Sequence, residues 1–149
     1  MSMTRIVSLA AVVALVLAAT NAVAEEPKSD AKAANKLVGT WKLISAKYGE
    51  MEQKFPEGVT MVKHVTPTQF MWATYDKDGT VTRAAGGAYT LDGDNYVETP
   101  EYGISDDFQL IKGKAQTFKC KVEANKWHHD GKLSNGLTIE EVWERMEKK

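Results

Sequence analysis

From Leu37 onward, hydrophobic and polar residues alternate along short stretches rich in Val, Ile, Thr, Tyr, Phe and Trp. Alternation with a period of two is typical of β-strands with one buried face, and no long stretch shows the period of an amphipathic helix. The pattern predicts about eight antiparallel strands, near 39–48, 59–65, 68–75, 80–91, 95–102, 116–123, 126–130 and 138–146. A short helix or turn is expected around 105–110.

Turn signals containing glycine separate these stretches. Asp78-Gly79, Asp92-Gly93, Asp130-Gly131 and Asn135-Gly136 each favour the positive φ angles of tight hairpins. Gly86-Gly87 falls inside a predicted strand and indicates a bulge or a sharp bend there. Eight strands joined by short hairpins favour closure, because a closed barrel leaves no exposed edge. We therefore expect an all-β fold consisting of a single antiparallel up-and-down barrel.

The N-terminal part of the chain has a different pattern. Arg5 is followed by an apolar run at 6–19, and Ala22-Val23-Ala24 then precedes two glutamates. This order is typical of a secretory signal peptide spanning 1–24, and the run is shorter than the ~20 residues that a spanning helix needs. We expect a polar leader at 25–36, a barrel domain at 37–149, and an exported protein, periplasmic or secreted, without a stable membrane anchor.

Composition narrows the class of protein further. A chain of 149 residues with this leader has room for one domain. Its formal net charge of −1 argues against nucleic acid as a partner, because phosphate binding needs a basic excess. Cys120 is the only cysteine, so the domain has no internal disulfide and must be held together by packing.

Alternation along each strand predicts which side chains face inward. The candidate ligand-binding residues are the larger members of this inward set: Phe70, Trp72, Tyr89, Tyr96, Glu98, Phe118, Trp127, His129 and Glu141. Trp143 and Cys120 are also expected inside, and His64 is a further inward candidate. Small inward residues at Thr74, Ala85 and Gly87 leave room for a modest cavity. A solidly packed interior stays open as an alternative, because side chains can fill a barrel of this size.

The ionisable members of the inward set are the candidates for chemistry. Glu98, His129 and Glu141, with His64, could form a satisfied polar network, an acid–base pair, or a group that orients the polar end of a ligand. We favour the third interpretation. His128 and His129 face opposite ways on a strand, so they do not share a metal ion. We expect no metal and no cofactor.

The first and last strands carry a pattern known from one group of barrels. Gly39-x-Trp41 at the start and Arg145 near the end resemble the barrel-closing signature of lipocalins and their calycin relatives. This resemblance implies that Trp41 plugs one end of the barrel and that Arg145 lies across its ring.

A closer resemblance is to small exported bacterial lipocalin-like domains of unassigned function. It rests on GTWKLISAKYG at 39–49, KHVTPTQFMW at 63–72, AAGGAYTLDGDNYVE at 84–98, KWHHDG at 126–131 and IEEVWERM at 139–146. The paired cysteines of many secreted lipocalins are absent. The resemblance implies the fold but no particular ligand and no catalytic residues.

These observations favour non-enzymatic binding of a small hydrophobic or amphipathic molecule inside the barrel. Two alternatives stay open. One is an enzyme that uses Glu141 and His129 as an acid–base pair on a small molecule. The other is an interaction module acting through its outer face, which would need a contiguous exposed apolar patch. The outward residues identified from the pattern are mainly Lys, Glu, Thr and Asp, and they give no sign of such a patch.

Overall fold

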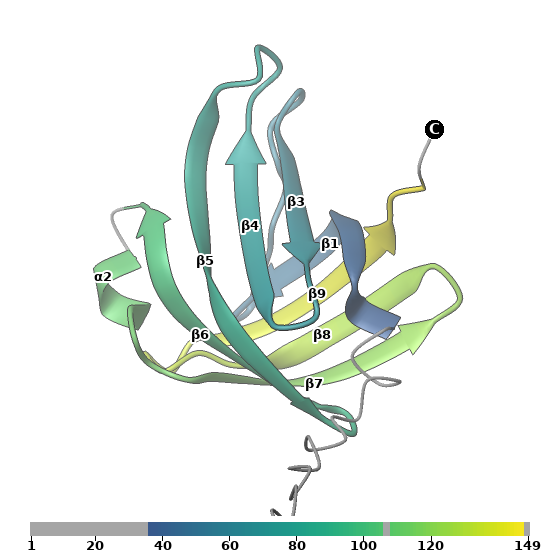
Figure 1. The fold of residues 1–149 in the computed structure, drawn as a ribbon. Helices are drawn as coiled ribbons and strands as arrows, with labels where there is room; N and C mark the ends of the chain where they lie inside the picture. Colours follow the sequence, from purple (N-terminus) through teal and green to yellow (C-terminus); the bar gives the residue numbers. More distant parts are fainter. Residues whose placement is uncertain (1–35, 106–107, 148–149) are drawn as a thin grey trace, which may run out of the picture.

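The computed structural model describes residues 36–105 and 108–147, so the expected signal peptide and most of the leader lie outside the described residues. The strands are β1 (Gly39–Tyr48), β2 (Met51–Glu52), β3 (Thr60–Val65), β4 (Gln69–Tyr75), β5 (Val81–Asp92), β6 (Asn95–Ile104), β7 (Gln116–Glu123), β8 (Lys126–Lys132) and β9 (Thr138–Arg145). A short helix, α2 (Phe108–Ile111), follows β6 (Figure 1). No helix in the described ranges is long and apolar enough to cross a bilayer.

The strands form a closed antiparallel barrel. Each of the strands from β3 to β9 pairs with its neighbour in the sequence, β1 pairs with β3, and the pairing of β1 with β9 closes the sheet. The two-residue strand β2 pairs only with the end of β1 and lies outside this ring of eight. The prediction of a single all-β, up-and-down antiparallel barrel of about eight strands is confirmed.

The barrel consists of two half-sheets that are joined at one end and diverge at the other. Pairing of β1 with β3 covers only Gly39 to Lys42, and pairing of β6 with β7 covers only Asn95 to Glu98. We call these two short ladders the seams. Beyond them, β3, β4 and β5 stand upright while β7, β8 and β9 run across them (Figure 1). The barrel therefore has a closed end at the seams and an open end, the mouth.

A tryptophan plugs the closed end. Trp41 is fully buried, and its indole Nε1 donates a hydrogen bond to the Leu37 carbonyl at 2.7 Å. The Arg145 guanidinium lies 4.1 Å from the centre of the Trp41 ring and donates to the carbonyls of Val38 and Lys36. A cation over an indole face contributes about 0.5–2 kcal/mol. Because Arg145 is on the last strand and Trp41 on the first, this contact also holds the ends of the barrel together.

Most of the predicted turns are present, but one is wrong. Gly79, Gly93 and Gly136 have the expected positive φ angles of 82°, 57° and 93°. Gly131 instead lies inside β8, opposite Ile139, where a Cβ atom would collide with the carbonyl oxygen of Thr117. This glycine therefore allows neighbouring strands to approach closely, and the chain turns only after Lys132.

Two smaller expectations concern β5 and α2. The ladder between β5 and β6 shifts register at Gly86 and Gly87, which confirms the predicted irregularity. A Cβ atom at Gly87 would overlap the Thr99 carbonyl oxygen, so only glycine fits this bend. The helix expected around 105–110 is found at Phe108–Ile111, with Phe108 buried against β6.

Candidate functional site

A cavity of about 590 Å³ lies between the two half-sheets and opens toward the mouth. Its apolar walls are formed by Met61, Trp72, Phe118, Ile139 and Trp143. Its polar side chains include Tyr48, Lys63, Thr74, Arg83, Glu98, Gln116, His129 and Glu141, and Gln53, Ser105 and Asn135 also line it. Around the mouth lie Phe55, Leu110, Ile111, Leu133 and Leu137, contributed by loops and α2. The interior is therefore hollow on the side away from Trp41.

The structure divides the nine candidate ligand-binding residues between two places. Trp72, Glu98, Phe118, His129 and Glu141 line the cavity. Phe70, Tyr89, Tyr96 and Trp127 are buried but do not line it. They belong to the packed core between the cavity and the closed end, which we call the floor.

The floor is a cluster of rings centred on Tyr96. The Tyr96 ring centroid lies 5.2 Å from that of Tyr89, 5.4 Å from Trp127 and 5.5 Å from His129. Trp127 in turn packs edge-on against Trp41 at 5.5 Å. Such offset and edge-to-face pairs stabilise a core beyond the area that they bury. The floor thus separates the cavity from the Trp41 plug.

Three buried polar atoms have no hydrogen-bond partner of good geometry: Tyr96 Oη and Trp127 Nε1 in the floor, and Nε2 of His129, whose ring packs against it. A buried polar group left unpaired costs about 1–3 kcal/mol. The floor is consequently aromatic without being purely apolar.

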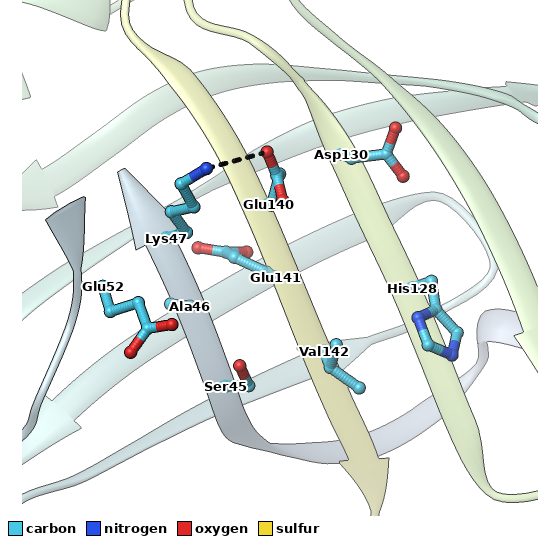
Figure 2. Close-up of a pocket in the computed structure, with 9 residues that line it drawn as sticks. All are labelled: Ser45, Ala46, Lys47, Glu52, His128, Asp130, Glu140, Glu141 and Val142. Carbon is cyan, nitrogen blue, oxygen red and sulfur yellow. Dashed lines mark ion pairs between the residues drawn. The ribbon is translucent and has the colours of Figure 1, made fainter. Parts of the chain in front are cut away.

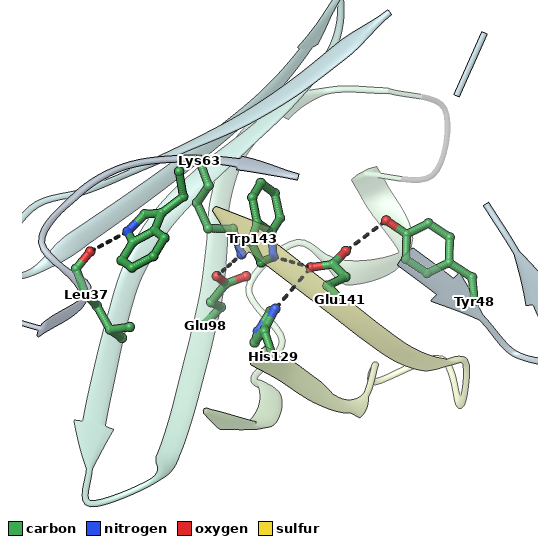
Figure 3. A network of polar contacts seen from close by, with 8 residues as sticks. Leu37, Tyr48, Lys63, Glu98, His129, Glu141 and Trp143 are labelled. Atoms are coloured by element: carbon green, nitrogen blue, oxygen red, sulfur yellow. Dashed lines mark hydrogen bonds and ion pairs between the residues drawn. The ribbon is translucent and has the colours of Figure 1, made fainter. Parts of the chain in front are cut away.

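Glu141 is the centre of a polar network on one wall of the cavity (Figure 3). The Tyr48 hydroxyl donates to Oε1 at 2.8 Å, and the Trp143 indole donates to Oε2 at 3.0 Å. His129 Nδ1 lies 3.0 Å from the same Oε2 atom. The geometry follows from strand pairing, because His129 is opposite Glu141 on β8 and Trp143 is two residues further along β9. Three strands thereby fix one carboxylate.

The protonation states within this network follow from burial and neighbouring charges. Burial, followed by the positive charge of Lys63, lowers the pKa of His129 and outweighs the opposite influence of Glu141. Burial alone would raise the pKa of Glu141, but the hydrogen bond from His129 and its charge when protonated, then the charge of Lys63 and the hydrogen bond from Tyr48, bring it down to about 2. At neutral pH the pair is therefore a carboxylate and a neutral imidazole, with Nδ1–H donating to Oε2.

Tyr48 remains a donor throughout the physiological pH range. Burial, together with the charge of Glu141 and the hydrogen bond to it, raises the pKa of the Tyr48 hydroxyl above its ordinary value of 10.0. Both oxygens of Glu141 thus accept hydrogen bonds from protein groups. This carboxylate does not need a ligand to satisfy it.

A buried ion pair occupies the adjoining wall. Lys63 Nζ lies 2.8 Å from Glu98 Oε1, and the two side chains are 2% and 6% exposed. The ammonium group also lies 4.9 Å from the Trp143 ring and 5.1 Å from the Trp127 ring. Because removing charges from water is costly, such a pair persists only with close partners of this kind.

The placement of Lys63 corrects one expectation. His64 was an inward candidate, but it is exposed on the outside of β3, where its Nδ1 lies 3.1 Å from the hydroxyl of Thr40. Lys63 faces inward in its place because Glu98 and the indole rings compensate its charge. Those partners come from strands far away in the sequence, so alternation within β3 could not reveal them.

Cys120 lies in the core beside the floor. Burial raises the pKa of its thiol to about 11, so it stays protonated at neutral pH. A protonated thiol is a poor nucleophile. Cys120 is thus a small packing residue.

Sequence reasoning missed several residues that line the cavity, among them Tyr48, Arg83 and Gln116. Tyr48 follows a bulge between Leu43 and Ser45 that shifts the alternation of β1. Simple counting from Trp41 therefore assigns its side chain to the wrong face. Gln116 shares the alternation of Phe118 and could have been found from it.

A second hollow, of about 460 Å³, lies on the outer surface of β1, β8 and β9 (Figure 2). Glu52, His128, Asp130 and Glu140 surround it, and Lys47 forms an exposed 3.8 Å ion pair with Glu140. In the part of the chain that the structure describes, no three His, Cys, Asp or Glu side chains are grouped to hold a metal ion. This groove is a solvated polar surface.

No protein-family model and no curated protein matches the chain. Among solved structures, it is similar to a redesigned β-barrel, with a TM-score of 0.52 and 17% identity over 80% of this chain and 99% of that one. A de novo designed fluorescence-activating β-barrel matches with a TM-score of 0.47 and 15% identity, over 76% of this chain and 97% of that one. At these identities the likeness to the first of them shows the barrel fold alone.

Proposed function

We propose that the barrel binds a small, mostly apolar molecule with a polar group, without chemically changing it. The observation that carries this proposal is the cavity of about 590 Å³ between the half-sheets. Sites for small molecules typically measure about 300–1,000 Å³ and combine apolar walls with a few fixed polar groups. The cavity fits both criteria.

The arrangement of its lining supports an amphipathic ligand. Trp72, Phe118 and Trp143 provide flat apolar contact, while the Lys63–Glu98 pair and the Glu141 network provide polar groups held in fixed positions. Rigid polar groups orient a ligand without a large loss of side-chain entropy. The apolar side chains around the mouth offer a path by which an apolar molecule can enter.

Native mass spectrometry of the protein purified from its own source, combined with organic extraction, tests the proposal directly. We expect a bound molecule of defined mass that is released by extraction. Binding of an environment-sensitive apolar dye, followed by quenching of tryptophan fluorescence, provides a second readout, because Trp72 and Trp143 line the cavity. Repeated recovery of empty protein that also fails to bind the dye would contradict the proposal.

A pair of matched variants locates the binding site. Thr74 is 8% exposed and lines the cavity, whereas Thr90 is exposed on the outer face of the neighbouring strand β5. Thr74→Phe should fill part of the cavity and weaken dye binding by at least about tenfold, which corresponds to 1.4 kcal/mol. Thr90→Phe should leave the affinity unchanged. Equal affinities in the two variants would place the dye elsewhere.

The alternative of an enzyme has one supporting observation, the 3.0 Å contact between His129 and Glu141. A carboxylate that holds a neutral imidazole by Nδ1 leaves Nε2 as a base. This alternative predicts that Glu141→Gln abolishes turnover of a small-molecule substrate while the melting temperature stays nearly constant. Loss of stability in that variant favours a structural and ligand-orienting role instead.

We also propose that this barrel is of the lipocalin-like type. Support comes from the Gly39-x-Trp41 sequence and from the stacking of Arg145 on Trp41 at the closed end. A sequence profile built from close homologues tests the assignment. It should match lipocalin-like families over the first and last strands, and a match to an unrelated family would overturn it.

Export is the third part of the proposal. The pattern of Arg5, the apolar run and Ala22-Val23-Ala24 supports cleavage after Ala24. Mass measurement of the protein recovered from the periplasm or the medium should give a chain beginning at Glu25. A cytoplasmic protein that retains Met1 would contradict it.

A further inference from the structure

Along its paired rows, the outer surface of β3, β4, β5 and β6 carries no Asp, Glu, Lys or Arg apart from Asp92, at the far end of the β5–β6 ladder. We call this surface the uncharged face. The ladders place the following residues on it: Thr60, Val62, His64, Gln69, Met71, Ala73, Tyr75, Val81, Ala84, Gly86, Ala88, Thr99, Tyr102 and Ile104. They alternate with the inward residues Trp72, Thr74 and Ala85, which fixes their direction. The expectation that the outer face lacks an apolar patch is therefore wrong.

Large apolar side chains on this face are exposed to solvent. Met71 is 40% exposed, Val81 47%, Tyr102 48% and Ile104 58%. Because they come from three adjacent strands, they form one contiguous patch rather than isolated residues. Contiguous exposed apolar patches on small proteins mark sites of interaction.

Small residues make the uncharged face flat. Ala73, Ala84 and Gly86 stand side by side across β4 and β5. A Cβ atom at Gly86 would overlap the ring of Tyr102, so this ring lies directly on the glycine backbone. A flat surface of this kind can pack closely against another flat surface.

The opposite side of the barrel differs in character. The outer surface of β7, β8 and β9 carries Lys119, Lys121, Glu123, Lys126, Asp130, Lys132, Glu140 and Glu144. Such a surface stays hydrated. Within strands β3 to β9, the large apolar side chains that are exposed, Met71, Val81, Tyr102 and Ile104, therefore all lie on one half-sheet, on the side that does not face the cavity. The other exposed large apolar residues lie on β1 and β2, in loops and α2 near the mouth, and after β9.

We propose that two copies of this protein associate through their uncharged faces to form a symmetric dimer. A two-fold dimer brings the same surface of each copy together, so a charge near its centre meets a like charge. The uncharged face avoids this repulsion. Charged residues lie at its borders: Lys42 beside Val62 on β1, Asp92 at the end of the β5–β6 ladder, and Glu101 in the bulge of β6. An apolar centre with a charged rim is the usual composition of such an interface.

The size of the face is sufficient for a weak specific dimer. Four strands spaced about 4.8 Å apart, with side chains on one face about 7 Å apart along each strand, cover about 500 Å². Two such faces bury about 1,000 Å², near the lower limit for specific interfaces. The dimer should therefore dissociate on dilution.

Sedimentation velocity and light scattering over a range of protein concentrations test the proposal. We expect the protein isolated from cells to change from monomer to dimer as its concentration rises. Met71→Glu and Ile104→Glu should each weaken the dimer by about 100-fold, because each places like charges opposite one another. Dye binding in the cavity should stay unchanged, since neither residue lines it.

Met51→Glu is the matched control, because Met51 is 69% exposed on β2, outside the uncharged face. It should dimerise like the unmodified protein, and the melting temperatures of the three variants show whether each is folded. A protein that stays monomeric at every concentration would overturn the proposal and leave the face to a different partner. Undiminished dimerisation of both Met71→Glu and Ile104→Glu would also overturn it.

Discussion

The carboxylate of Glu141 shows how single residues set the properties of the cavity wall. It accepts hydrogen bonds from Tyr48 on β1, His129 on β8 and Trp143 on its own strand, β9. A buried carboxylate with this many donors is stable as an anion. Sequence alternation predicted that Glu141 and His129 face inward together, but not Lys63, because its compensation depends on Glu98 and on rings from other strands.

Replacing Glu141 by Gln should reduce the free energy of unfolding by about 1–3 kcal/mol, since the amide nitrogen cannot accept the hydrogen bonds that the carboxylate accepts. Chemical denaturation at neutral pH measures this change. Glu140→Gln is the control, because Glu140 is on the same strand but faces solvent, where its ion pair with Lys47 is exposed. Equal stability of the two variants would show that the network does not support the fold.

The pKa shifts of His129 and Glu141 predict loss of stability in acid. The pKa of folded His129 is below 6.5, and that of folded Glu141 is about 2 instead of 4.5. The unfolded chain therefore binds more protons below about pH 6.5 and again below about pH 4.5. Unfolding should become easier as the pH falls through these ranges.

Denaturation curves at several pH values test this prediction. His129→Gln should flatten the dependence between pH 7 and pH 5, since it removes the group that titrates there. His128→Gln should preserve the dependence, because His128 faces outward on the same strand. If the stability of His129→Gln still falls steeply between pH 7 and pH 5, another group causes the pH dependence.

At the scale of elements, the strands were predicted well and their irregularities less well. The stretch expected at 39–48 is β1, and the one expected at 116–123 is β7. The predicted turn at Asp130-Gly131 is wrong because Gly131 serves close packing against Thr117 rather than a positive φ angle. The bulge in β1 between Leu43 and Ser45 has no glycine or proline to signal it. Local propensity cannot tell a turn glycine from one that allows close strand packing, or locate such a bulge, since both depend on neighbouring strands.

The bend at Gly87 gives a prediction at this scale. Gly87→Ala should destabilise the barrel by about 3 kcal/mol or more, because its methyl group overlaps the Thr99 backbone, which cannot move aside. Gly93→Asn is the comparison: Gly93 has φ of 57° with open space around it, and Asn tolerates that conformation. Thermal denaturation should show a large decrease in melting temperature for the first variant and a small one for the second.

At the scale of the whole molecule, the barrel separates its tasks by position. The closed end holds the Trp41 plug, the opposite end holds the cavity, and one half-sheet carries the uncharged face. The closed antiparallel barrel was predictable because its hairpins are short and its alternation is regular. The uncharged face was not recognised, because its rows emerge only when residues of β3 to β6 are placed side by side.

This separation predicts that stability and binding can be changed independently. Arg145→Ala should reduce the free energy of unfolding by about 2–4 kcal/mol, through loss of the contact with Trp41 and of the hydrogen bonds to Val38 and Lys36. The affinity for an apolar dye should stay the same, because neither Arg145 nor Trp41 lines the cavity. Parallel loss of affinity and stability would show that the two ends are coupled.

The short seams have a kinetic consequence. The half-sheets are joined by strand ladders only near the closed end, and α2's segment adds one backbone hydrogen bond, from Gly113 to Pro100. The two half-sheets can therefore separate at the mouth without breaking the hydrogen bonds of a strand ladder. Escape of a bound molecule should follow this breathing motion rather than unfolding, so its dissociation rate should be the same in Arg145→Ala as in the parent protein. Amide protons near the Trp41 plug should exchange with solvent far more slowly than amide protons of the strand ends at the mouth.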